Sequence, residues 1–222
     1  GRLGPALGGG ESTALVRASQ QPEGMVSGFD EAVRTLRNSI LLSDVDRRLR
    51  SLLITSASPS EGKSTMGVHL AIAHAQQGHK TLLIDGDLRK PSVHKRFNLP
   101  AGKGLSNVLT TEEDWKGLLV SPEELPGLHV LPAGPPSRKA SDLIGRGLEE
   151  LLMEAAEIYD LIILDAPPLL GFAEPLQMAS TVGGVLATAF NAPQRMRYGG
   201  ARDLMLAATV ALADGRVIRA GR

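Results

Sequence analysis

Short apolar runs rich in Leu and Ile recur along the central part of the chain. The runs SLLIT (51–55), TLLID (81–85) and LIILD (161–165) contain almost no polar alternation, and the last two end in aspartate. Such runs are typical of strands that are buried on both faces of a parallel sheet. Two further strands are predicted within GLHVLPAG (127–134) and GGVLATAF (183–190).

Between these runs the apolar positions follow a helical period. In FDEAVRTLRNSILL, for example, Val33, Leu36 and Ile40 recur at helical spacing with polar residues between them. Helices are predicted in this way over 29–42, 65–77, 141–159 and 201–213. Alternating strands and helices predict an α/β fold: a three-layer α/β/α sandwich around a mostly parallel sheet, of the P-loop NTPase type.

The two ends of the chain differ from this pattern. Residues 1–28 are rich in Gly and Pro and lack periodicity, which predicts a linker or flexible arm before a domain over 29–222. Near the other end, RVIRAGR (216–222) is a poor strand. Because the chain begins at Gly1, it can be part of a longer protein.

Composition narrows the possible partners and chemistry. The 24 basic and 24 acidic side chains balance, so net charge gives no reason to expect a nucleic-acid partner. Cysteine is absent, which removes disulfides and thiolate metal sites. The longest apolar stretch, Leu204–Ala213, is far shorter than the roughly 20 residues of a membrane-spanning helix.

The segment that follows the first apolar run has the order of a phosphate-binding loop. A Pro- and Gly-containing turn ends in Gly-Lys-Ser and leads into a predicted helix, although Ala57 replaces the first glycine of the general pattern. Backbone N–H groups and the helix N-terminus would face a phosphate, and Lys63 could reach the β- and γ-phosphates. The predicted nucleotide-binding residues are Ser58, Pro59, Ser60, Glu61, Gly62, Lys63, Ser64 and Thr65. An ordinary strand-to-helix connection is the simpler reading of this tripeptide.

The aspartates at the strand ends favour the nucleotide site over an ordinary connection. Carboxyl ends of parallel strands form the ligand crevice of doubly wound sheets. Asp85, Asp87 and Asp165 are therefore expected beside the phosphate loop, where the Ser64 hydroxyl can join a Mg²⁺ shell. The simpler alternative is that Asp85 and Asp87 only cap the turn that follows them.

Five segments carry a family resemblance. They include the Pro-Ser-Glu sequence before Gly-Lys and an Asp-x-Asp-x-Arg motif followed by Lys-Pro-Ser. In chain order these segments are EAVRTLR (31–37), TSASPSEGKST (55–65), LLIDGDLRKPSVHKRF (82–97), GLHVLPAGPP (127–136) and YDLIILDAPPLL (159–170). The chain resembles the cytoplasmic kinase domain of bacterial tyrosine kinases that regulate capsular and exopolysaccharide chain length.

The resemblance implies roles for individual residues. Lys63 would bind the phosphates of ATP, while Ser64, Asp87 and Asp165 would serve Mg²⁺. Asp85 would be the base that accepts a proton from the attacking tyrosine, and Arg89 would support the site.

The resemblance also implies partners. Glu31, Arg34 and Arg37 would mediate self-association, and the domain would work at the cytoplasmic face of the membrane with an embedded polysaccharide chain-length regulator, fused or separate. Transfer in trans would go to Tyr198 of another subunit or to a tyrosine of a partner, because Tyr159 opens a predicted buried strand.

Two other functions remain open. An ATPase switch of the MinD/ParA type normally carries an early lysine in its loop, where this chain has Ser58. Two departures from the kinase pattern keep open a non-catalytic ATP-binding scaffold of a polysaccharide export complex: the chain has only two tyrosines, and residues 190–222 diverge from the family. Glu174 also stands where the family usually has aspartate.

Overall fold

A six-stranded sheet with the order β3-β2-β4-β1-β5-β6 forms the centre of the protein. The structure, a computed structural model, describes residues 28–42, 50–100, 102–111, 113–137, 140–144, 147–170, 172–187, 208–212 and 217–220. The strands are β1 (Ser51–Thr55), β2 (Thr81–Asp85), β3 (Leu128–Leu131), β4 (Leu161–Asp165), β5 (Ala208–Leu212) and β6 (Val217–Ala220). The first four are mutually parallel, and β5 and β6 pair antiparallel at one edge. The predicted mostly parallel sheet is confirmed.

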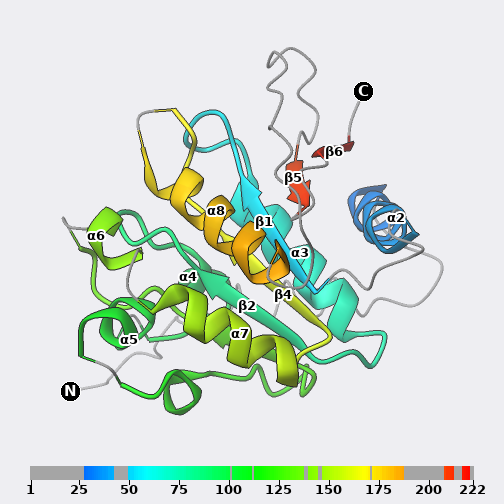
Figure 1. Cartoon of the computed structure of the whole chain (residues 1–222). Coiled ribbons are helices and arrows are strands. Elements are labelled where there is room, and N and C mark those ends of the chain that lie inside the picture. Colours follow the sequence, from blue (N-terminus) through cyan, green and yellow to red (C-terminus); the bar gives the residue numbers. More distant parts are fainter. Residues whose placement is uncertain are drawn as a thin grey trace, which may run out of the picture.

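Helices cover both faces of the sheet and make the predicted three layers (Figure 1). One apolar core joins the sheet to α2 (Gly28–Leu42), α3 (Lys63–Ala75) and α4 (Val93–Arg96). A second core joins the other face to α5 (Leu105–Thr111), α6 (Ala140–Ile144), α7 (Leu148–Ile158) and α8 (Glu174–Ala187), with a short 3₁₀ helix at Trp115–Leu118. Successive residues of β1 alternate between the cores, Leu52 and Ile54 on one side and Leu53 on the other. Burial on both faces explains its unbroken apolar sequence.

Three of the predicted elements are wrong. Residues 183–187 of the predicted strand 183–190 continue α8, because an apolar run alone does not distinguish a buried helix from a strand. Residues 208–212 of the predicted helix 201–213 form β5, whose sequence ATVAL suits a strand paired with β1. The predicted helix 141–159 is broken at Gly147, which has a φ of 75° and separates α6 from α7.

The structure also describes short parts of the two end regions of the chain. The segment taken as a poor strand contains β6, which pairs with β5. The predicted arm lies outside the described residues except for Gly28, which opens α2. Within the described parts of the chain, no helix combines the length and the hydropathy needed to cross a bilayer.

Candidate nucleotide site

The phosphate loop connects β1 to α3 and is stabilised by hydrogen bonds among its own residues. Gly62, just before the helix, has a φ of 88°, a conformation that favours glycine. The Ser56 hydroxyl donates to the Ser58 carbonyl at 2.8 Å, and the Ala57 N–H donates to a Glu61 carboxylate oxygen at 2.9 Å. Pro59, Ser60 and Gly62 are exposed, so the loop is accessible to a ligand.

Lys63 and two of the predicted aspartates meet at the carboxyl ends of the strands. The Lys63 Nζ lies 3.2 Å from the Asp87 Oδ2, 3.8 Å from the Asp165 Oδ1 and 3.2 Å from the Ser64 Oγ. Asp85 and Asp165 are partners in the register of β2 and β4. The sequence-predicted Lys63, Ser64, Asp87 and Asp165 therefore form one cluster at the start of α3.

Gly86 allows the two aspartate-bearing strand ends to approach each other. Its N–H donates to the Asp165 carbonyl at 2.8 Å. A Cβ atom at this position would lie 2.9 Å from the Met178 Cε and 3.0 Å from the Asp165 carbonyl oxygen. A larger residue at 86 would therefore push the strand ends apart.

Asp85 is fully buried and organises the turn after β2. Its Oδ2 accepts the N–H groups of Ser92 and Val93 at 3.1 and 3.0 Å, and its Oδ1 accepts that of Asp87 at 3.2 Å. This is the turn-capping role that the sequence left open, and it holds Asp87 toward Lys63. Burial, and then repulsion by Asp165, raises the pKa of Asp85 to about 7 despite the three N–H donors.

Asp165 is the carboxylate of the cluster that most needs compensating positive charge. The residue has no solvent exposure, and its partner is the Lys63 ammonium, 3.8 Å from Oδ1 and too far for a hydrogen bond. Burial raises its pKa to about 6, although the Lys63 ammonium opposes the shift. A buried carboxylate is costly unless a charge compensates it, and here one lysine is shared between Asp87 and Asp165. Oxygen donors from a carboxylate and a hydroxyl suit Mg²⁺, so the residues present fit the ion.

The protein side chains alone would not enclose that ion. In the described portion of the sequence, no group of three or more His, Asp or Glu is arranged to hold a metal. Mg²⁺ sites commonly use one or two carboxylates together with substrate phosphates and water. The site therefore fits a metal that arrives with a nucleotide.

Arg89 pairs with Glu174, an interaction that the sequence did not reveal. Its Nε lies 2.6 Å from the Oε1 of Glu174, which opens α8 and is only 1% exposed, and its guanidinium lies 5.2 Å from the centre of the Phe172 ring. The available signal was a single acidic residue at the start of the otherwise uncharged segment EPLQMASTVGGVLA.

The three predicted self-association residues do not share one environment. Glu31 and Arg34 are exposed on α2, whereas the Arg37 Nη1 donates to the Ala73 carbonyl of α3 at 2.9 Å. Arg37 therefore attaches α2 to α3 of its own domain through Nη1, while Glu31 and Arg34 point their side chains to the surface.

Of the two tyrosines of the chain, Tyr159 lies among the described residues. Tyr159 is 4% exposed, and its hydroxyl contacts the His129 Nδ1 at 2.9 Å, which agrees with the structural role predicted for it. Tyr198, the predicted acceptor, lies outside the described residues.

Comparison with known proteins defines the class to which this site belongs. The AAA domain family matches residues 60–184, more than half of the chain, and the chain belongs to that family. The MinD protein of Pyrococcus horikoshii, solved with Mg-ADP, shares the fold at 22% identity, with a TM-score of 0.50 over 60% of this chain and 54% of that one.

Within this class the relatives are bacterial tyrosine kinases, and the chain belongs to them. It is 41% identical to tyrosine-protein kinase YwqD of Bacillus subtilis over 170 residues, covering 76% of this chain and 70% of that protein. It is 32% identical to the kinase etk of Escherichia coli over 72% of this chain but only 22% of the relative.

Two solved structures are similar to this chain over more than two thirds of its length. The chimerical protein CapA2B2 gives a TM-score of 0.67 at 34% identity over 77% of this chain and 74% of that one. The kinase domain of E. coli ETK gives 0.65 at 31% identity over 68% and 60%.

Proposed function

We propose that this chain is an ATP-dependent protein-tyrosine kinase that uses Mg²⁺. The observation that carries the proposal is the Lys63 ammonium, placed 3.2 Å from Asp87 and 3.8 Å from the buried Asp165 at the end of a phosphate loop. A cation beside two carboxylates suits the transfer of a phosphoryl group, because catalysis of that reaction is mainly positioning and charge stabilisation.

Each side chain has a distinct task in this proposal. Lys63 neutralises charge on the β- and γ-phosphates, and backbone N–H groups of the loop and of the first turn of α3 hold them. Ser64, Asp87 and Asp165 would hold Mg²⁺, which would supply positive charge that stabilises the transferring phosphoryl group. Asp85 is the candidate base, since a pKa of about 7 suits proton acceptance near neutral pH.

The acceptor and the partners belong to the same proposal. Transfer goes in trans, to Tyr198 of a second copy or to a tyrosine of a partner, since Tyr159 is buried. The kinase works at the cytoplasmic face of the membrane with an embedded chain-length regulator and thereby controls capsular or exopolysaccharide synthesis. The kinship supports this: one relative is a Klebsiella pneumoniae kinase described as lying in the cps region, 33% identical over 72% of this chain.

The fate of the γ-phosphate distinguishes the proposal from its two rivals. With radiolabelled ATP and Mg²⁺, a kinase gives phosphotyrosine on the chain or on an added tyrosine-rich peptide. Free phosphate alone supports an ATPase switch of the MinD/ParA type. Nucleotide binding with neither product supports a non-catalytic scaffold.

A further inference from the structure

The Arg89 side chain has an anchor of its own beside the nucleotide site. Its Nε pairs with the Oε1 of Glu174 at 2.6 Å, and the carboxylate is 2% exposed, whereas the Arg89 side chain is 39% exposed. A buried carboxylate in a charge-assisted hydrogen bond is a much firmer anchor than an ion pair between two solvated groups. The ring of Phe172, 5.2 Å from the guanidinium carbon, supports a second side of the group.

The position of this anchor follows from the loops that surround the phosphate loop. Arg89 lies two residues after Asp87, whose Oδ1 accepts the Lys90 N–H at 2.9 Å and so folds the segment back toward the site. Glu174 begins α8 directly after the loop that follows β4. That loop is itself bonded to the phosphate loop, because Leu169 and Leu170 donate to the carbonyls of Ser56 and Ala57 at 2.8 and 3.1 Å. The ion pair therefore joins the two loops that flank the nucleotide site.

The geometry of the pair leaves the useful end of the arginine available. A guanidinium has five N–H donors, and Glu174 is bonded through Nε. The two terminal Nη groups form the planar fork that binds a phosphoryl group in bidentate fashion. Holding Nε fixes the direction of that fork, which a free arginine side chain would have to find at an entropic cost.

We propose that Glu174 is a positioning residue that orients Arg89 toward the transferring phosphoryl group. The inference rests on the proposed kinase function and assigns to Glu174 a role that acts only through Arg89. Phe172 restricts the same guanidinium from its face. Glu174 contributes no contact with the nucleotide itself.

A double-mutant cycle on phosphotransfer tests the assignment. Glu174→Gln and Arg89→Ala should each lower kcat about tenfold or more, and the double variant should be no slower than Arg89→Ala alone, because Glu174 has nothing left to orient. Glu174→Asp keeps the carboxylate and should retain more of the rate than Glu174→Gln. The KM for ATP should change less than kcat in all three.

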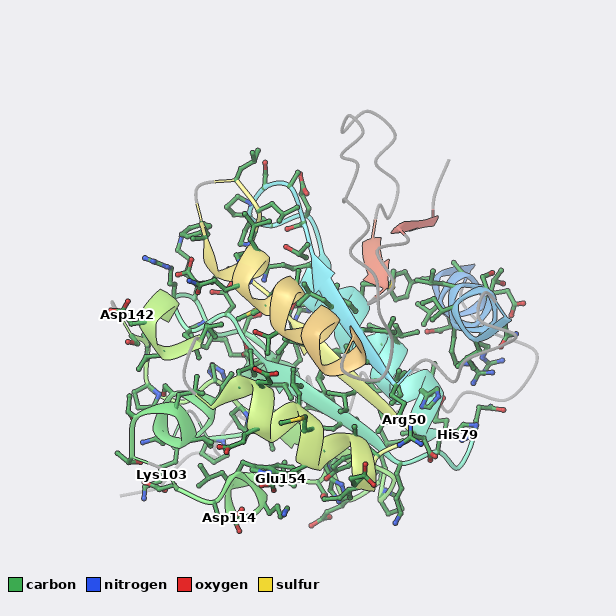
Figure 2. The ribbon with its side chains drawn as sticks, in the orientation of Figure 1. Arg50, His79, Lys103, Asp114, Asp142 and Glu154 are labelled. Atoms are coloured by element: carbon green, nitrogen blue, oxygen red, sulfur yellow. The ribbon has the colours of Figure 1, made fainter. Side chains whose placement is uncertain are left out.

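Comparing Tm with kcat distinguishes a positioning role of Glu174 from a purely structural one. Arg89→Ala leaves a buried carboxylate unpaired and should lower Tm, while adding Glu174→Gln should restore Tm without restoring kcat. Glu154→Gln is the matched control: its carboxylate pairs with Lys116 at 2.9 Å, both side chains are about half-exposed, and Figure 2 shows it in the lower part of the view, far from the loop after β1. It should change neither quantity.

The outcomes separate this inference from the proposed function. If the wild type is active and the losses of kcat in the two single variants multiply in the double variant, the positioning role is wrong and the kinase function stands. The same conclusion follows if kcat falls only where Tm falls. An inactive but folded wild type overturns both.

Discussion

At the residue scale, the charge of Lys63 gives a prediction about nucleotide binding. Lys63→Met should weaken binding of Mg-ATP by about tenfold or more, which corresponds to about 1.4 kcal/mol, because it removes the point charge directed at the phosphates. Calorimetric titration measures the change. Lys103→Met is the matched control, since that lysine pairs with Glu113 at 3.0 Å on the surface and lies at the lower left of Figure 2. Equal affinity of wild type and Lys63→Met would exclude the proposed phosphate contact.

The cluster around Lys63 was predictable from the order of the sequence. Strand ends in a parallel sheet meet at one edge, so a Gly-Lys-Ser turn and strand-terminal aspartates had to converge. The pair of Arg89 and Glu174 was not predictable, since it joins residues 85 positions apart through a side-chain geometry that no spacing encodes. For Asp85 the sequence left two roles open, a base or a cap of the following turn, and did not decide between them.

The Asp85 carboxyl predicts the direction of the pH dependence. A base must be unprotonated, and the pKa of Asp85 is raised to about 7, so kcat/KM should rise from pH 5 to about 7 and then level off. Asp85→Asn should abolish this rise along with most of the rate. Asp160→Asn is the control: its Oδ2 also accepts a backbone N–H, that of Lys80 at 2.9 Å, but it precedes β4 at the opposite end of the strand. A flat wild-type profile over this range would contradict the role of Asp85 as base.

At the element scale, the parallel part of the sheet was predictable and the edge was not. Strands β1 to β4 are buried on both faces, and their sequences show it. For 183–187 and 208–212, the apolar sequence was compatible with a helix or a strand, and tertiary pairing decided. At Gly147, one residue of left-handed conformation divides a helical pattern in two.

The attachment of α2 gives a prediction at this scale. Arg37→Ala removes the bond to the Ala73 carbonyl and should lower the free energy of unfolding by about 1–2 kcal/mol. Arg34→Ala, on the exposed side of the same helix, should change it by less than about 0.5 kcal/mol. Denaturant titration of both variants measures the difference. If both variants lose the same free energy of unfolding, the bond from Arg37 to the Ala73 carbonyl contributes nothing to stability.

At the scale of the whole molecule, the different environments of Arg34 and Arg37 decide which residues to substitute in a test of self-association. Glu31 and Arg34 remain exposed, so a double variant Glu31→Ala with Arg34→Ala should weaken subunit association while the domain keeps its stability. Sedimentation velocity with nucleotide present tests this, and Ser39→Ala, also exposed on α2, serves as the control. An oligomer that is indifferent to the double variant would place the interface elsewhere.

The proposed activity of the whole molecule is transfer of the γ-phosphoryl group of ATP to tyrosine. A mixture of an isotopically labelled Lys63→Met chain with unlabelled wild type, Mg²⁺ and ATP tests it, because mass spectrometry identifies the phosphorylated residues on each chain. We expect phosphotyrosine at Tyr198 of the labelled chain, which is unable to phosphorylate itself, and none when Lys63→Met is incubated alone. A folded, nucleotide-binding wild type that yields no phosphotyrosine on either chain or on an added tyrosine-rich peptide would contradict it.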